Sequence, residues 1–210
     1  MDEVVTGAEV DPRVTRVRHA LADAGADADV VVLDHAPRSA DDLAAQVGAP
    51  AGALVRCHLL LAEEVDVGGR AQEGPDGEQE GPDGETTTPA APSAGAPVRV
   101  LLVVAPVGRR LLLSQVAEAA TGLGVGSVRR PPPREVRALT GSSPEDLPPL
   151  GLPGDRLVVE AVLVDTALRE HEVLWVPAGR PGTLLAVGHD ELLRLTLGHP
   201  VELASAGPPT

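Results

Sequence analysis

The sequence of 210 residues contains no Lys, no Phe and no Tyr, and it has one Trp, Trp175, and one Cys, Cys57. A single Cys excludes an internal disulfide and gives no sign of an oxidising compartment. Because aromatic side chains are almost absent, Leu, Val and Ala must fill the interior, and many small side chains are needed to reach normal packing density. All seventeen basic residues are Arg.

Long apolar runs are also absent. No stretch of about 18 apolar residues is present that could span a membrane as a helix. The first residues, MDEVVTGAEVDPR, are acidic and lack the apolar core of a signal peptide. Together with the lone Cys, these features lead us to expect a cytoplasmic protein without a membrane partner.

The net charge of −14 argues against a nucleic-acid partner at first sight. The charge is uneven, however, because nine acidic residues and only one Arg lie between Glu63 and Glu85. Contact with a nucleic acid would therefore depend on local clusters of Arg rather than on the overall field.

The chain length fits one domain, for which we expect residues 11–204, with short tails at 1–10 and 205–210. An acidic segment rich in Gly and Pro interrupts this domain at 64–97, where EGPDGE occurs twice and TTTPAAPSAGAP follows. Such a composition predicts a disordered insert, which we interpret as an overgrown hairpin loop. A regulatory or partner-binding role for the insert is the alternative.

Capping signals predict two early helices. Asp11 and Pro12 begin one that Gly25 ends, and Ser39 caps another that ends at Gly48. Further helices are expected at 114–121, 133–139 and 189–197, and strands at 30–33, 53–61, 98–105, 127–128, 158–164, 172–176, 183–187 and 201–203. Short strands mixed with short helices, without a regular alternation, predict an α+β fold on a mixed, largely antiparallel sheet.

The expected strand at 53–61 carries polar groups on one face. Since successive side chains point to opposite faces, Arg56 and His58 share a face, while Cys57 points the other way into the core. His58 is interpreted as a partly buried His, with a role as a base near neutral pH as the alternative.

Four segments in order resemble the YbaK/prolyl-tRNA synthetase-associated editing family. They are DHAPRSADDLAAQVGAPAGALVRCHLLL at 34–61, VRVLLVVAPVGRRLLLSQVAEA at 98–119, PREVRALTGSSPEDLPPLGL at 133–152, and VLVDTALREHEVLWVPAGRPGTLLAVGHDELLRLT at 162–196. The resemblance implies a barrel-like core with short surrounding helices. It also implies hydrolysis of the ester of mischarged aminoacyl-tRNA, typically tRNA-Pro carrying Cys or Ala. This reaction needs no metal and no cofactor; the partner is the tRNA acceptor end, with prolyl-tRNA synthetase as a further candidate.

The resemblance assigns roles to several residues. Arg56 stands where the family usually has Lys; it keeps the positive charge and gains a fork suited to phosphate, but it cannot accept a proton. Its alternative role is to bind at the pocket rim without catalysis. Gly179 and Gly182 flank Arg180 and Pro181 in a turn whose amides could hold an oxyanion, or that simply joins two strands.

Further residues are expected to bind substrate. Leu150 and Gly151 end a loop beginning at Gly141 that would face this turn; it departs from the family's Phe-ended loop, which leaves substrate choice open. Asp165 would orient a polar group or, as we favour, cap the following turn. His35 matches the family's His before the first capped helix; we interpret it as a structural His, with a substrate contact as the alternative.

Arg129 and Arg130 are the candidate contacts to tRNA phosphates, with solvated surface as the alternative. The six His residues show no spacing typical of a zinc site. Three functions remain: an editing hydrolase, a weakened paralogue that binds without efficient turnover, and an interaction protein that uses the insert.

Overall fold

The computed structural model describes residues 11–26, 28–63 and 98–203. The expected tails and the predicted insert at 64–97 lie outside these residues. The helices are α1 (Pro12–Asp23), α2 (Ala40–Val47), α3 (Leu113–Thr121), α4 (Pro133–Thr140) and α5 (His189–Thr196), with 3-10 turns at Ala51–Ala53 and Thr166–Glu170. The strands are β1 (Asp29–Val32), β2 (Val55–Glu63), β3 (Val98–Pro106), β4 (Ser127–Arg129), β5 (Leu157–Asp165), β6 (Leu174–Pro177), β7 (Thr183–Val187) and β8 (His199–Val201).

The helix ends follow the capping chemistry of the sequence. The Asp11 side chain accepts a hydrogen bond from the Arg13 amide, and the Ser39 hydroxyl accepts one from the Asp42 amide. Gly48 ends α2 with φ 65°, a left-handed conformation that costs glycine little. These local predictions are confirmed.

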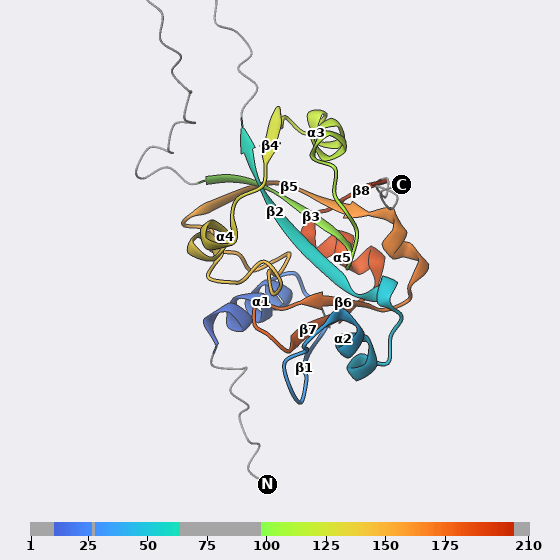
Figure 1. The fold of residues 1–210 in the computed structure, drawn as a ribbon. Helices are drawn as coiled ribbons and strands as arrows, with labels where there is room; N and C mark the ends of the chain where they lie inside the picture. The colour runs from blue at the N-terminus through green and yellow to red at the C-terminus, as the bar shows by residue number, and fades with distance from the viewer. Residues whose placement is uncertain (1–10, 27, 64–97, 204–210) are drawn as a thin grey trace, which may run out of the picture.

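The strands form two sheets, which confirms the α+β class. Five strands make a mixed sheet in the order β4-β2-β3-β5-β8, and three make an antiparallel sheet in the order β1-β7-β6. A single bridge between Leu54 and Trp175 links the two sheets. Figure 1 shows the larger sheet above the smaller one, with α3 beyond the larger sheet and α2 beside the smaller one.

Pairing in the larger sheet mixes two directions. β2 and β3 are antiparallel, as expected for a hairpin, with Leu61 opposite Val100. β3 pairs with β5, and β5 with β8, in parallel. β4 joins β2 only at Leu61–Glu63, so no strand among the described residues covers the edge of β2 from Val55 to Leu60.

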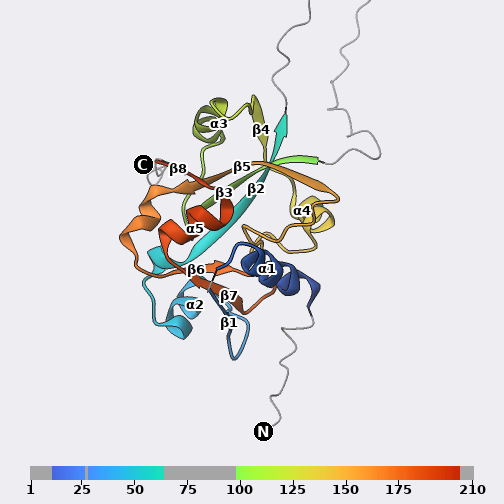
Figure 2. The same ribbon diagram turned by 180° about the vertical axis from the view of Figure 1, so that it is seen from behind.

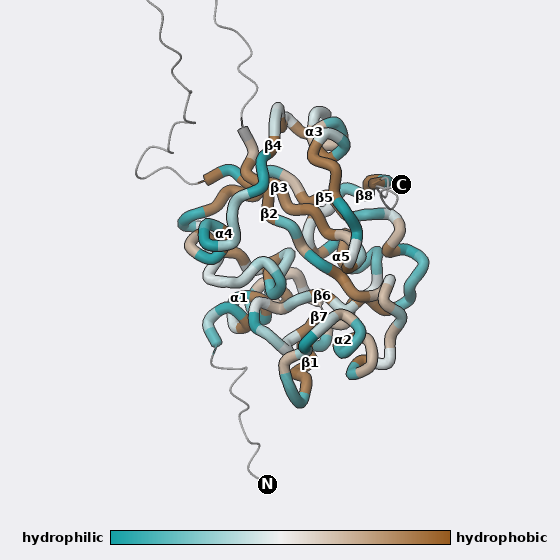
Figure 3. Tube along the Cα trace, viewed as in Figure 1, coloured by the Kyte–Doolittle hydropathy of each residue, from teal (hydrophilic) through white to brown (hydrophobic). Residues whose placement is uncertain are grey.

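The core has two parts, one on each face of the larger sheet. One part lies between the two sheets and includes Cys57 of β2, which is 1% exposed, together with side chains of α1 and α5. The other packs Leu101 and Val103 of β3 against Val116 of α3. Figure 3 shows the apolar central strands, and the reverse view in Figure 2 shows α1 and α5 on the side away from α3. The placement of Cys57 in the core is confirmed.

In the described part of the chain, no helix combines the length and the apolar character that crossing a membrane requires.

Candidate active site

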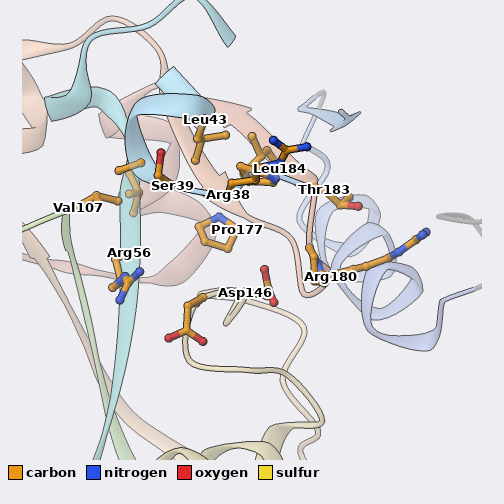
Figure 4. A pocket seen from close by; sticks show the side chains of 16 residues that line it. Arg38, Ser39, Leu43, Arg56, Val107, Asp146, Pro177, Arg180, Thr183 and Leu184 are labelled. Atoms are coloured by element: carbon orange, nitrogen blue, oxygen red, sulfur yellow. The ribbon is translucent and has the colours of Figure 1, made fainter. Parts of the chain in front are cut away.

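A cavity of about 220 Å³ lies where the start of β2 meets the turn between β6 and β7. Its wall includes Arg56, Arg180, Pro181 and Gly182, which the sequence singles out, and these residues come from distant parts of the chain. The segment before α2 and the loop after α4 complete the wall, and Figure 4 shows this arrangement from close by.

Arg56 is the cation at the β2 side of the cavity. Its side chain is half-buried, and it makes no hydrogen bond or ion pair with any residue that the structure describes. A partly desolvated guanidinium without a partner is a costly arrangement, and a bound anionic or carbonyl oxygen would satisfy it.

The turn between β6 and β7 has a well-defined backbone. The Thr183 amide donates to the Arg180 carbonyl over 3.1 Å, with Pro181 second and Gly182, at φ 71°, third in the turn. This is the residue pattern of a type II β-turn. Among the described residues, the amides of Arg180 and Gly182 donate to no acceptor, and both residues line the cavity.

The side chain of Arg180 lies apart from Arg56. Figure 4 shows it pointing away from Arg56, on the side of the cavity wall that carries Thr183. Its charge also contributes to lowering the pKa of Asp11 to about 2, after the larger effect of the hydrogen bonds from Arg13. Arg180 therefore contributes backbone rather than charge to the cavity.

Gly179 lies outside the cavity wall, at the start of the turn, in a backbone conformation that favours glycine. Its φ is 95°, and a Cβ atom there would stand 3.0 Å from the Cβ of Arg13 on α1. Its carbonyl accepts a hydrogen bond of 3.2 Å from the buried Ser142 hydroxyl. Gly179 is thus the point where α1, the turn and the loop after α4 meet.

The loop after α4 faces the turn, but with other residues than the sequence suggests. Glu145 and Asp146 line the cavity. Leu150 is 8% exposed and belongs to the core, and a Cβ on Gly151 would stand 2.7 Å from the Val17 amide nitrogen of α1. Leu150 and Gly151 therefore anchor the loop, while its middle reaches the cavity.

A second cavity of about 230 Å³ runs along the uncovered edge of β2 and shares Arg56 and Glu145 with the first. His58 and Arg130 line it. Arg56 and His58 are partly exposed whereas Cys57 between them is buried in the core, which confirms that Arg56 and His58 share the face opposite to Cys57. Burial first, and then the charges of Arg130 and Arg56, lower the pKa of His58 to about 4. His58 is therefore neutral at pH 7.

Arg129 and Arg130 differ in their contacts. The two terminal guanidinium nitrogens of Arg129, Nη1 and Nη2, donate to the Glu135 carboxylate at 3.3 Å. Arg130 is exposed, lines the second cavity and has no hydrogen-bonding or ion-pair partner among the described residues. Only Arg130 lies beside a cavity that continues from Arg56.

Asp165 and His35 lie outside both cavities. The fully buried carboxylate of Asp165 accepts from the Ala167 amide and from two nitrogens of Arg109, at 2.7 and 3.2 Å. The favoured capping role of Asp165 is confirmed. His35 is exposed, and its ring lies 3.3 Å from the Gln46 side chain.

Sequence reasoning missed the acids of the cavity. Glu145 and Asp146 were visible as adjacent acids in an otherwise apolar, Pro-rich loop, and this was the available signal. Arg38 and Ser39 also line the cavity, because the segment that caps α2 passes over it. A helix cap in the sequence gives no sign that its neighbours border a site.

The fold and the cavity define an α+β protein with a candidate site built around Arg56, which has no partner among the described residues, and the Gly-Arg-Pro-Gly turn at 179–182. The family model of the aminoacyl-tRNA editing domain matches residues 93–195, and this match confirms the family that the sequence motifs indicate. It includes the 179–182 turn and the loop with Glu145 and Asp146, but it begins after Arg56 and His58. No curated protein matches the chain by sequence.

Solved structures confirm the fold. A candidate trans-editing enzyme for prolyl-tRNA synthetase is 24% identical, with a TM-score of 0.66 over 93% of this chain and 99% of its own. A scaffold protein used for computational grafting of epitopes is 23% identical, with the same TM-score and coverage. A hypothetical protein is 21% identical, with a TM-score of 0.63 over 90% of this chain and 98% of its own.

Proposed function

We propose that the protein hydrolyses the ester bond of mischarged aminoacyl-tRNA in trans, on tRNA-Pro-type substrates that carry a small amino acid such as Cys or Ala. The observation that carries the proposal is that Arg56 lines one cavity with the 179–182 turn, and that among the described residues neither its side chain nor the Arg180 and Gly182 amides have a partner. The family match over residues 93–195 and the similarity to a candidate trans-editing enzyme support it.

The cavity has the charges that an aminoacyl ester requires. The α-ammonium group of the substrate is positive near neutral pH, and Glu145 and Asp146 on one wall of the cavity complement this charge. The carbonyl oxygen of the substrate becomes negative as the ester is attacked. Arg56 together with the Arg180 and Gly182 amides can stabilise that negative charge. The limited volume favours a small side chain.

The reaction needs only water as second reactant. The water oxygen bonds to the acyl carbon, the bond from that carbon to the ribose oxygen breaks, and the ribose oxygen takes up a proton. The products are the free amino acid and uncharged tRNA. Substrate of this kind is present in the cytoplasm, which is where we place the protein.

Deacylation of a panel of mischarged tRNAs, including Cys- and Ala-tRNA-Pro, tests the proposal with wild type, Arg56→Ala and Arg56→Lys. We expect Arg56→Ala to lose at least about a hundredfold in kcat/KM, the usual loss for one oxyanion donor, and Arg56→Lys to keep part of the activity. Arg169→Ala is the matched control, because Arg169 is exposed and lines neither cavity.

Two outcomes would contradict the proposal or its mechanism. Absence of turnover by wild type on every tRNA, with charged tRNA still bound, favours the paralogue that binds without turnover. Equal activity of Arg56→Ala and Arg169→Ala would remove Arg56 from the mechanism.

A further inference from the structure

The second cavity, lined by Arg56, His58 and Arg130, is a feature that neither the motifs nor the family match explains. It continues from the first cavity, since Arg56 and Glu145 belong to both walls. Each cavity alone is smaller than the roughly 300–1,000 Å³ of typical ligand sites, whereas the two together reach that range. A ligand that fills both would pass Arg56 at its middle.

The two cavities differ in the charged groups on their walls. The first has two carboxylates, Glu145 and Asp146, on its wall, together with Arg38, Arg56 and Arg180, of which Arg180 points away from Arg56. The second has Arg56, Arg130 and the neutral His58, against Glu145 as its one acid among the described residues. An anionic group of a ligand therefore meets one carboxylate fewer in the second cavity, where Arg130 has no partner among the described residues.

The other walls of the second cavity suit a nucleoside. Pro131, Pro133 and Pro144 offer rigid apolar surfaces, and Val136 and Leu147 are further apolar residues of the wall. The chain has no Phe or Tyr for base stacking, so proline rings and the guanidinium plane of Arg130 are the available flat surfaces. The neutral ring of His58 can exchange a hydrogen bond with a ribose hydroxyl.

We propose that the second cavity binds the terminal nucleotide of the charged tRNA, with Arg130 on its 5′-phosphate and His58 beside its ribose. The aminoacyl group then lies in the first cavity, and the ester between the two parts lies at Arg56. This inference rests on the proposed function and assigns each half of the substrate to its own cavity.

Binding of two stable probes tests the assignment without turnover. Both carry alanine joined through an amide to 3′-amino-3′-deoxyadenosine, and only one has a 5′-phosphate. By calorimetry, wild type should bind the phosphorylated probe at least about tenfold more tightly, as expected for a charge-assisted hydrogen bond to phosphate. High salt should reduce this preference.

The variants Arg130→Gln and Arg134→Gln form a matched pair. Both remove one exposed Arg from neighbouring positions, but Arg134 lines neither cavity. Arg130→Gln should abolish the preference for the phosphorylated probe, and Arg134→Gln should keep it. The same preference in both variants, or no preference in wild type, would overturn the assignment.

Failure of the proposed function gives a different result. If wild type shows the phosphate preference but deacylates no charged tRNA, hydrolysis is wrong and the nucleotide site stands. If it deacylates charged tRNA and Arg130→Gln still prefers the phosphorylated probe, the hydrolase stands and the nucleotide lies elsewhere.

Discussion

Arg56 can act only through its charge. A guanidinium stays protonated at any pH at which the protein is folded, so it can polarise an acyl carbonyl but cannot take a proton from water. The attacking water must lose its proton to another group or to solvent. His58, two residues further along β2, is neutral at pH 7, but a pKa of about 4 makes it a weak base. We therefore assign His58 to binding rather than to proton transfer.

The pKa of His58 has a consequence for stability. Its value of about 4 in the folded protein lies below the ordinary 6.5, so the unfolded chain takes up the proton first as the pH falls. The free energy of unfolding should therefore decrease between about pH 6.5 and pH 4, by up to a few kcal/mol at about 1.4 kcal/mol per pKa unit.

Urea unfolding of wild type and His58→Leu at several pH values between 7 and 4 measures this effect. Carboxylates titrate in both proteins, so the difference between them isolates His58. We expect wild type to lose stability relative to His58→Leu as the pH falls. Parallel curves would show that His58 has an ordinary pKa.

At the scale of elements, α1 supports the site without lining either cavity. Arg13 donates to the Gly141 carbonyl, and Arg16 donates to the carbonyls of Thr140 and Gly151 at 3.4 and 3.1 Å. The loop with Glu145 and Asp146 is thereby held at both of its ends. Since Gly179 also packs on Arg13, a single helix fixes the separation of two facing walls.

Gly151→Ala tests this support. The substitution combines a strained φ of 70° with a Cβ at 2.7–2.8 Å from backbone atoms of α1. Gly108→Ala is the matched control, because Gly108 has φ 86° but nothing lies within 4 Å of its added Cβ. We expect Gly151→Ala to lower the free energy of unfolding by about 2–4 kcal/mol and Gly108→Ala by about 1 kcal/mol. Equal losses in urea unfolding would mean that the contact with α1 adjusts freely.

Local chemistry was predictable from the sequence, and long-range contacts were not. The caps at Asp11 and Ser39 and the turn at Arg180–Thr183 depend on neighbouring residues, so the sequence predicts them directly. The parallel pairing of β5 with β3 and β8 depends on the whole chain, because an apolar strand does not specify its partner. For the same reason, the sequence could not show that Glu145, rather than Leu150, reaches the cavity.

For the whole molecule, the central question is how an acidic protein binds an anionic substrate. The net charge is −14, and much of it lies in and beside the segment 64–97. The described residues instead present Arg56 and Arg130 along one pair of cavities. Binding of tRNA should therefore depend on these local cations, against a repulsive background that salt screens.

Deletion of residues 66–95 tests whether the electrostatic repulsion between the acidic segment and tRNA can be removed. Leu61 pairs with Val100, so Glu63 and Val98 lie at the same end of two antiparallel strands, and the four remaining residues could close a hairpin. The deletion removes seven acids and one Arg. We expect an intact fold, about 1–2 kcal/mol of added stability from the shorter loop, retained deacylation and tighter tRNA binding at low salt.

Circular dichroism, urea unfolding and tRNA binding at two salt concentrations measure these outcomes. The matched control replaces residues 66–95 by an uncharged Gly-Ser linker of equal length, which separates the effect of charge from that of loop length. Tighter binding in both variants, vanishing at high salt, identifies charge as the cause. Loss of deacylation in both would instead make the insert part of the active protein, and the two cavities of the described residues would then be only part of the site.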